Sequence, residues 1–140
     1  LRYKMDIILN NFIWYYKIMS HFTHIKTRFQ NLFYLEKALN RLNIDYQKNI
    51  SPQSPNPSLV IAQSNGYDLE FSWNSQEYEL IADISFWQQT YPVETFMDQI
   101  AQQYAGEVVI GESQKLGFQP IKYQQNSDGS NTLILERWNS

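Results

Sequence analysis

The sequence predicts an α+β fold, a single domain in which two main helices pack on one face of an antiparallel β-sheet. Apolar and polar residues alternate over residues 67–84 and again over 118–138, as is typical of β-hairpins. Apolar residues recur at spacings of three and four over residues 31–42 and 93–104, as in helices that bury one side. With 140 residues and 43% hydrophobic content, the chain can bury one core.

The central hairpin follows from the parity of its side chains. Because side chains alternate along a strand, each of its two strands has one apolar row. Bringing these rows together places Phe71 opposite Tyr78 and Leu69 opposite Leu80, with a short turn centred on Asn74 and Ser75. A third extended segment is expected to follow, as far as residue 89. The apolar rows are Tyr67, Leu69, Phe71 and Trp73 on the first strand, and Tyr78, Leu80, Ala82 and Ile84 on the second.

The same parity gathers carboxylates on the opposite face of the hairpin. In the predicted register Glu70 faces Glu79, and like charges in a cross-strand pair are destabilising. This repulsion could be offset by the basic residues Lys26 and Arg28 of the first domain strand and Lys122 of the last hairpin, or by a cation or a protein partner. The simplest alternative is a solvated face. The polar row consists of Asp68, Glu70, Ser72, Glu77, Glu79 and Asp83, interrupted by Ile81.

The first half of the chain contains further predicted elements. Residues 20–29 alternate and are predicted to form a strand, and Asn31 can cap a helix that continues to Leu42. A short strand is expected at 44–47. The prolines of residues 51–58 predict a loop. Another brief strand, at 59–63, is expected to lead into the central hairpin.

The second half begins with a helix signal at Tyr91-Pro92, because proline is favoured in the first turn of a helix. The helix is expected to reach about Gly111 or beyond, with Gly117 able to cap a longer version. The C-terminal hairpin should turn at 127–129, where Gly129 supplies the positive φ. This register pairs Tyr123 with Leu133 and Ile121 with Leu135. Pro120 indicates an edge or strand-end position.

Residues 1–18 differ from the rest of the chain and are predicted to form an extension outside the compact domain of residues 19–140. Their uncharged apolar stretch, 7–16, is too short for a spanning helix, which needs about 20 residues. No membrane span is therefore expected. The chain begins with Leu, and Met19 is an alternative start. Attachment to a membrane surface through residues 1–18 is an alternative.

Composition excludes several classes of function. The absence of Cys rules out disulfides, zinc–thiolate sites and a catalytic thiol. A formal net charge of −3 argues against a nucleic-acid partner, whose phosphates need positive charge. His21 and His24 fall on opposite faces of a strand and cannot together chelate a metal there. No Gly-rich phosphate loop or catalytic motif is present, so we predict neither catalytic residues nor a cofactor.

The carboxylate row is the candidate functional feature, with two interpretations. The first is a non-enzymatic accessory protein that docks on a protein partner through this acidic face. The second is a divalent-metal-binding protein or a metal-assisted enzyme, because hard cations prefer oxygen ligands. The sequence does not predict the oligomeric state. The docking candidates are Asp68, Glu70, Glu77, Glu79 and Asp83, and the metal candidates are Asp68, Glu70, Glu77 and Glu79.

Four phrases carry a resemblance to a known family. They are MSHFTHIKT at 19–27, NGYDLEFSWNSQEYELIAD at 65–83, FWQQ at 86–89 and LILERW at 133–138. Together they resemble the family of hypothetical chloroplast reading frame 35, found in algal plastids and cyanobacteria, over essentially residues 19–140. The resemblance implies a plastid-encoded protein of the chloroplast stroma. It implies no activity, cofactor or catalytic residue. Relatives begin at the position of Met19, which sets residues 1–18 apart.

Overall fold

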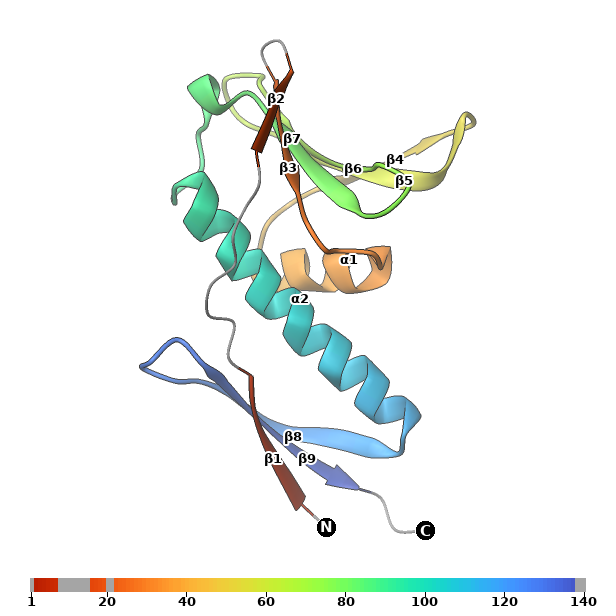
Figure 1. Cartoon of the computed structure of the whole chain (residues 1–140), viewed down its shortest axis with the longest axis vertical. Helices are drawn as coiled ribbons and strands as arrows, with labels where there is room; N and C mark the ends of the chain where they lie inside the picture. The colour runs from red at the N-terminus through yellow and green to blue at the C-terminus, as the bar shows by residue number, and fades with distance from the viewer. Residues whose placement is uncertain (1, 8–15, 20–21, 138–140) are drawn as a thin grey trace.

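The computed structural model describes residues 2–7, 16–19 and 22–137. It confirms the α+β class, with two helices and antiparallel strands, but the strands form two sheets rather than one. Figure 1 shows the long helix α2 running from the upper sheet to the lower one. The elements are β1 (Arg2–Ile7), β2 (Tyr16–Met19), β3 (Phe22–Lys26), α1 (Leu32–Arg41), β4 (Gln47–Ser51), β5 (Ser54–Ile61), β6 (Leu69–Trp73), β7 (Tyr78–Ala82), a 3₁₀ turn η1 (Ile84–Phe86), α2 (Val93–Lys115), β8 (Phe118–Gln125) and β9 (Asn131–Arg137).

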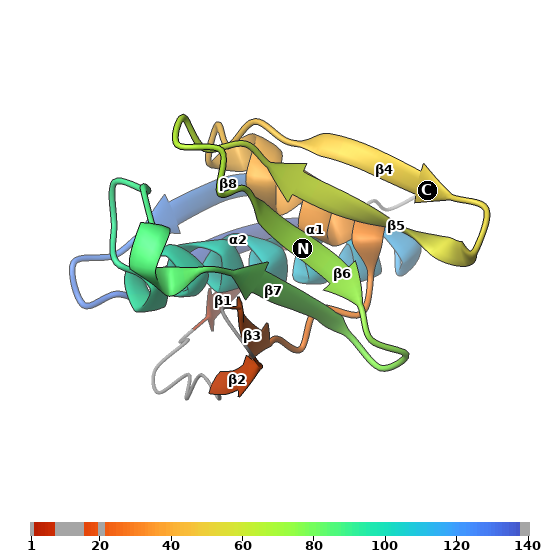
Figure 2. The ribbon, with the colours of Figure 1, turned by 90° about the horizontal axis from the view of Figure 1, so that it is seen from above.

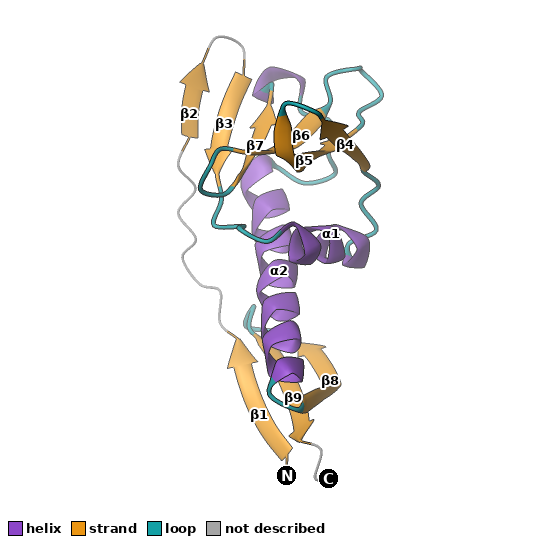
Figure 3. Ribbon diagram, turned by 90° about the vertical axis from the view of Figure 1, so that its right-hand side faces the viewer, coloured by secondary structure: helices purple, strands orange, loops and turns teal. Residues whose placement is uncertain are grey.

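The upper sheet has the strand order β2-β3-β7-β6-β5-β4, and both helices lie on the same side of it (Figure 3). Seen from above, the strands lie in front of the helices, and no described helix covers their outer face (Figure 2). The core lies between this sheet and the helices. Its fully buried members include Ile25, Leu39, Phe71, Leu80 and Ile100. Packing on one face only explains why buried and half-buried residues alternate along β6 and β7.

Helix α1 confirms its sequence signals. The Asn31 side chain accepts a hydrogen bond from the backbone N–H of Tyr34, which satisfies one of the free donors at the helix start. Leu35 and Leu39 are fully buried, one turn apart on the side that faces the sheet. Leu32 and Leu42 pack against the same core at the two ends of the helix. The spacing of apolar residues therefore fixes which side of α1 is buried.

Helix α2 also confirms its prediction, including the longer version. It runs without interruption from Val93 to Lys115, about 34 Å at 1.5 Å per residue, and Gly117 follows it with φ of 86°. Gly111 lies inside the helix, where an added Cβ would be 2.2 Å from the hydroxyl oxygen of Tyr34. Its small size therefore allows α1 to approach α2 closely.

The central hairpin has the predicted faces in a different register. Phe71 pairs with Leu80 and Trp73 with Tyr78, two residues away from the predicted pairing. The predicted turn centre was wrong because the side chain of Asn74 accepts hydrogen bonds from the backbone N–H groups of Gln76 and Glu77. Asn74 therefore precedes the turn, and the positive φ belongs to Ser75. A two-residue shift keeps every side chain on its face, so the parity argument was correct.

The segment before this hairpin was predicted wrongly. Residues 51–58 are largely strand, because β5 begins at Ser54, and β4 occupies 47–51 rather than 44–47. Pro55 and Pro57 are tolerated because β5 pairs with β6 only from Leu59 to Ile61. Nearer the tip, β5 pairs with the edge strand β4 alone. A missing N–H donor costs little where one side of the strand has no partner.

The segment after the hairpin does not continue as a strand. The carboxylate of Asp83 accepts a hydrogen bond from the N–H of Ser85, which starts the 3₁₀ turn at Ile84. Before the hairpin, Tyr67 lies outside β6 and stacks on Phe86, with ring centroids 3.9 Å apart. Tyr67 and Ile84, at the outer ends of the two predicted apolar rows, therefore lie in connecting segments and not in strands.

The C-terminal hairpin belongs to the lower sheet, of order β1-β9-β8. Tyr123 pairs with Leu133 as predicted, and Gly129 has φ of 87° in the turn. The predicted pairing of Ile121 with Leu135 was wrong, because the register shifts at Pro120 and Pro120 itself lies opposite Leu135. β8 is an edge strand, as the proline indicated.

Two pieces of residues 1–18 are described as strands. β1 pairs with β9 in the lower sheet, and β2 pairs with β3 in the upper sheet. Residues 8–15 of the predicted extension lie outside the described residues. The division into an extension, 1–18, and a compact domain, 19–140, stays a prediction.

Candidate functional site

The five candidate carboxylates do not form one row. Glu70 and Glu79 lie on β6 and β7, at outward-facing positions between buried neighbours. Glu77 lies in the turn of the hairpin. Asp68 immediately precedes β6 and Asp83 immediately follows β7. The sequence pattern was extended too far at each end, because alternation holds only while the chain remains a strand.

Two of these carboxylates hold connecting segments in place. Oδ1 of Asp68 accepts a hydrogen bond from the backbone N–H of Gln63 at 2.9 Å. Oδ1 of Asp83 accepts one from Ser85 at 3.1 Å. Each closes a local turn of the chain, which is a structural role characteristic of aspartate.

Glu79 is satisfied within the sheet. Oε2 lies 3.1 Å from Nδ1 of His24, and Oε1 accepts a hydrogen bond from the side-chain amide of Asn74 at 3.0 Å. Lys26 lies opposite Glu79 in the pairing of β3 with β7. Burial alone would raise the pKa of Glu79, but the hydrogen bonds from Asn74 and His24 and the charge of Lys26 lower it. Lys26 of the neighbouring strand β3 thus supplies positive charge beside Glu79, as the sequence analysis expected. Lys122 does not, because it lies in the other sheet.

Glu70 is different. It pairs with Val60 on one side and Ile81 on the other, so it does not face Glu79. Both neighbours are half-buried on a face that no described helix covers. Among the described residues, no hydrogen bond or ion pair involves the carboxylate of Glu70 or that of Glu77. We call Val60, Glu70, Glu79 and Ile81 the open sheet face.

The metal-binding interpretation needs several oxygens that converge on one point. In the part of the chain that the structure describes, no group of three or more His, Cys, Asp or Glu side chains could hold a metal ion. The two structural aspartates and the paired Glu79 explain this, since each is oriented by its own partner. Metal binding through Asp68, Glu70, Glu77 and Glu79 stays a prediction.

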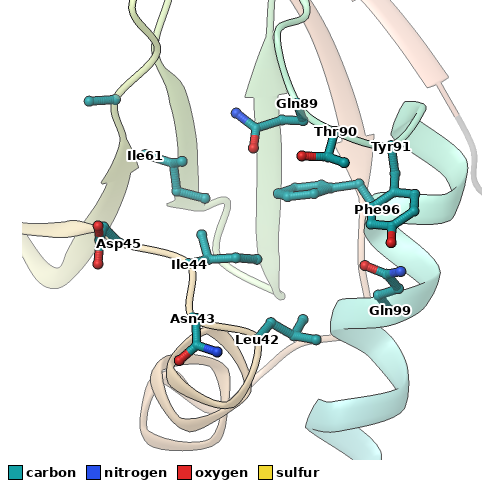
Figure 4. A pocket seen from close by; sticks show the side chains of 11 residues that line it. Leu42, Asn43, Ile44, Asp45, Ile61, Gln89, Thr90, Tyr91, Phe96 and Gln99 are labelled. Atoms are coloured by element: carbon teal, nitrogen blue, oxygen red, sulfur yellow. The ribbon is translucent and has the colours of Figure 1, made fainter.

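A groove at the end of the upper sheet was not predicted. Its first part is a pocket of about 360 Å³ between the ends of α1 and β5 and the start of α2. Figure 4 shows Ile44 and Ile61 on one side, facing Phe96, Tyr91 and Gln99 across the opening. Its second part, about 720 Å³, continues past β5 to Val60 and Asp68. The two parts share Ile44, Asp45 and Ala62, and we call them together the sheet-end groove.

Gln63 holds one side of this groove together. It is 8% exposed, and its side-chain amide donates to the backbone carbonyls of Tyr67 and Phe86. Its Oε1 accepts from the backbone N–H of Gln88 and the side chain of Gln89. A buried amide with every bond satisfied fixes the two loops relative to each other. The sequence offered no signal for this, because three of the four partners of the Gln63 side chain are 23 to 26 residues away along the chain.

A second unpredicted cluster joins α1, α2 and the lower sheet. Nε of Arg41 donates to Glu107 at 2.6 Å, and the Glu107 side chain is only 5% exposed. The buried hydroxyl of Tyr123 lies beside them and has no hydrogen-bond partner within the part of the chain that the structure describes. The cavity at this point is about 10 Å³, room for one water molecule at most. The ion pair therefore joins α1 to α2 beside β8, and the small cavity next to Tyr123 is too small for a ligand larger than water.

The described helices include none that is long and apolar enough to cross a membrane. Two surfaces described above, the open sheet face and the sheet-end groove, are the features from which we argue a function.

Comparison with known proteins places the chain in a family. Residues 38–134 match the family described as "Protein of unknown function (DUF1257)". The chain therefore belongs to the DUF1257 family. "Uncharacterized protein ycf35" of Trieres chinensis is 64% identical over 124 residues, covering 84% of this chain and 97% of its own length. The protein of the same name from Cyanophora paradoxa is 40% identical, covering 86% and 98% respectively. These matches confirm the resemblance seen in the sequence. No solved structure matches the chain.

Proposed function

We propose that this protein is a non-enzymatic accessory protein of the plastid stroma that docks a basic partner protein through its open sheet face. The observation that supports the proposal is the position of Glu70, a carboxylate without a partner among the described residues, between half-buried Val60 and Ile81. A flat surface with apolar area around a free charge suits protein recognition better than catalysis.

Charge supports a basic partner. The chain carries a formal net charge of −3, and complementary charge steers association and selects partners. Three of the docking candidates, Asp68, Asp83 and Glu79, already have partners inside the protein and are therefore less available to another protein. Glu70 and Glu77 are left as the docking charges. The plastid setting rests on the relatives, which carry the name ycf35.

The test is a pull-down from plastid extract with the full chain as bait. Glu70→Lys reverses the free charge on the open sheet face, and Glu112→Lys makes the same change at an exposed position near the end of α2. We expect Glu70→Lys to lose a partner that the original chain and Glu112→Lys retain, with all three equally folded by circular dichroism. Retention of the same partners by all three baits would refute the proposal.

A further inference from the structure

The sheet-end groove has the size of a binding site. Its two parts of about 360 and 720 Å³ fall in the range of 300–1,000 Å³ that is typical of ligand sites. They meet at Ile44, Asp45 and Ala62, so the groove follows the segment that connects α1 to β4. Both parts are partly open to solvent and share residues, which suits an occupant that extends from one part into the other.

Apolar side chains line the first part of the groove. Ile61 and Phe96 are 4% exposed, and Tyr91, at 46%, lies at the rim. Figure 4 shows Ile44, Ile61 and Phe96 directed into the same space, with Gln89 and Gln99 at its edges. An occupant therefore meets an apolar floor with uncharged hydrogen-bonding groups around it.

The charge of the lining has one sign. Asp45 and Asp68 are its carboxylates, and both residues are exposed. Among the described residues, no Lys, Arg or His lines either part. Within the described part of the chain Asp45 has no side-chain partner, while Asp68 uses Oδ1 for Gln63. Desolvation and repulsion would oppose an anionic occupant here, and a cationic one would find two carboxylates.

We propose that the sheet-end groove binds an extended segment of a partner protein in which apolar and basic side chains alternate. Its apolar side chains would pack against Ile44, Ile61 and Phe96, and its basic ones would reach Asp45 and Asp68. The groove is continuous with the open sheet face, because Val60 lines the groove and pairs with Glu70. This proposal rests on the proposed function, since it names the segment by which the docked partner is anchored.

The probe is a short fluorescein-labelled peptide of alternating leucine and arginine, and the control is a peptide of alternating leucine and glutamate. Binding to the full chain is followed by fluorescence anisotropy. Asp45→Lys reverses the free charge, and Ala62→Tyr fills the junction of the two parts from an exposed position without a charge change. We expect each to weaken binding of the basic peptide at least about tenfold, because like charges or a blocked site remove its main contacts. Glu112→Lys serves as the matched control and should bind as the original chain does.

The site of binding is checked by amide chemical-shift changes on adding the basic peptide. Changes at Ile44 and Ala62 are expected. Changes centred on Ile81, or equal affinity of Asp45→Lys and Ala62→Tyr with the original chain, would overturn the groove proposal. Absence of saturable binding to the original chain, or equal binding of the acidic peptide, would overturn it as well.

The two proposals can fail separately. If Glu70→Lys loses the plastid partner and Asp45→Lys and Ala62→Tyr keep it, the open sheet face is the docking surface and the groove is not its anchor. If the groove variants lose both peptide and partner while Glu70→Lys keeps them, the groove binds the partner without the sheet face.

Discussion

The two sheets of this protein are stabilised in different ways. The upper sheet packs on both helices, and the main core cluster draws all its buried residues from positions 25–101. The lower sheet packs on the far half of α2, and among its residues with described side chains the buried apolar ones are Leu133 and Leu135, both on β9. Beside them the described part of the hairpin buries polar residues, Ser130, Asn131 and Thr132.

This difference indicates which of the two sheets should unfold locally more readily. Hydrophobic stabilisation grows with the apolar area removed from water, so we expect the described side chains of the lower sheet to contribute less of it than those of the upper region. Cooperative units with fewer buried apolar contacts open at lower free energy. The surfaces argued to bind a partner, the open sheet face and the sheet-end groove, both lie on the upper region, which contains the main core cluster. A rigid support favours binding, because less entropy is lost on association.

The largest expected effect is a loss of stability on truncating a buried leucine, compared between the two sheets. Leu80→Ala in the upper core should lower the free energy of unfolding by about 3–5 kcal/mol, and Leu135→Ala in the lower sheet by about 2 kcal/mol. Leu80 is 0% exposed and Leu135 is 4% exposed. Urea unfolding followed by circular dichroism measures both, and amide hydrogen exchange should show early opening of β8 and β9 in Leu135→Ala. Equal losses, with one shared exchange rate, would show that the sheets unfold as one unit.

An intermediate effect compares two glycines of α2. An added Cβ at Gly111 would be 2.2 Å from the Tyr34 hydroxyl and 2.7 Å from its ring, whereas at Gly106 it would be 3.0 Å from the Tyr123 hydroxyl. Gly111→Ala should cost about 1–3 kcal/mol, because buried Tyr34 must move. Gly106→Ala should be nearly neutral, since better helix propensity, about 1 kcal/mol, offsets the tighter contact.

The control for Gly111 is a change in its neighbour. In a Tyr34→Ala background the clash is gone, so Gly111→Ala should become stabilising, by up to about 1 kcal/mol. Thermal unfolding of the original chain, Gly111→Ala, Tyr34→Ala and the double variant measures the coupling between the two positions. A penalty that persists without the tyrosine ring would mean that the helix itself, and not its contact with α1, requires glycine.

The smallest expected effect concerns acid pH. The pKa of Glu79 is lowered in the fold, against the desolvation that would raise it, by Asn74, His24 and Lys26. A lowered pKa gives stability that is present above the unfolded value of 4.5 and is lost as the pH falls through the folded value. The hydrogen bonds from Ser130 lower the pKa of Asp128 in the lower hairpin in the same sense, from 3.8.

Glu79→Gln should therefore lower the urea midpoint at neutral pH and reduce its fall towards acid pH. Asp128→Asn should leave the midpoint almost unchanged and speed exchange only at the hairpin turn, because the aspartate is solvent-exposed. Urea unfolding at neutral pH and at about pH 3.5 measures both. An unchanged acid slope in Glu79→Gln would show that the contacts of Glu79 with His24 and Asn74 add nothing to global stability.

The local elements of the fold could be predicted from the sequence. Asn31 before a leucine stripe specified α1, and Pro92 and Gly117 bounded α2. Alternation specified which side chains of the central hairpin face inward. These signals act over a few residues, through hydrogen bonds and side-chain periodicity that each segment carries within itself. The carboxylates of the candidate site could be named for the same reason.

The tertiary structure decided what lies beside what. It separated Glu70 from Glu79, because Asn74 shifted the turn. It placed Lys26 opposite Glu79 and the last hairpin in a second sheet. It also built the sheet-end groove from segments that the sequence keeps far apart, with Gln63 binding two loops. Such contacts depend on which of many possible distant partners each segment packs against. No single stretch of the chain contains that information.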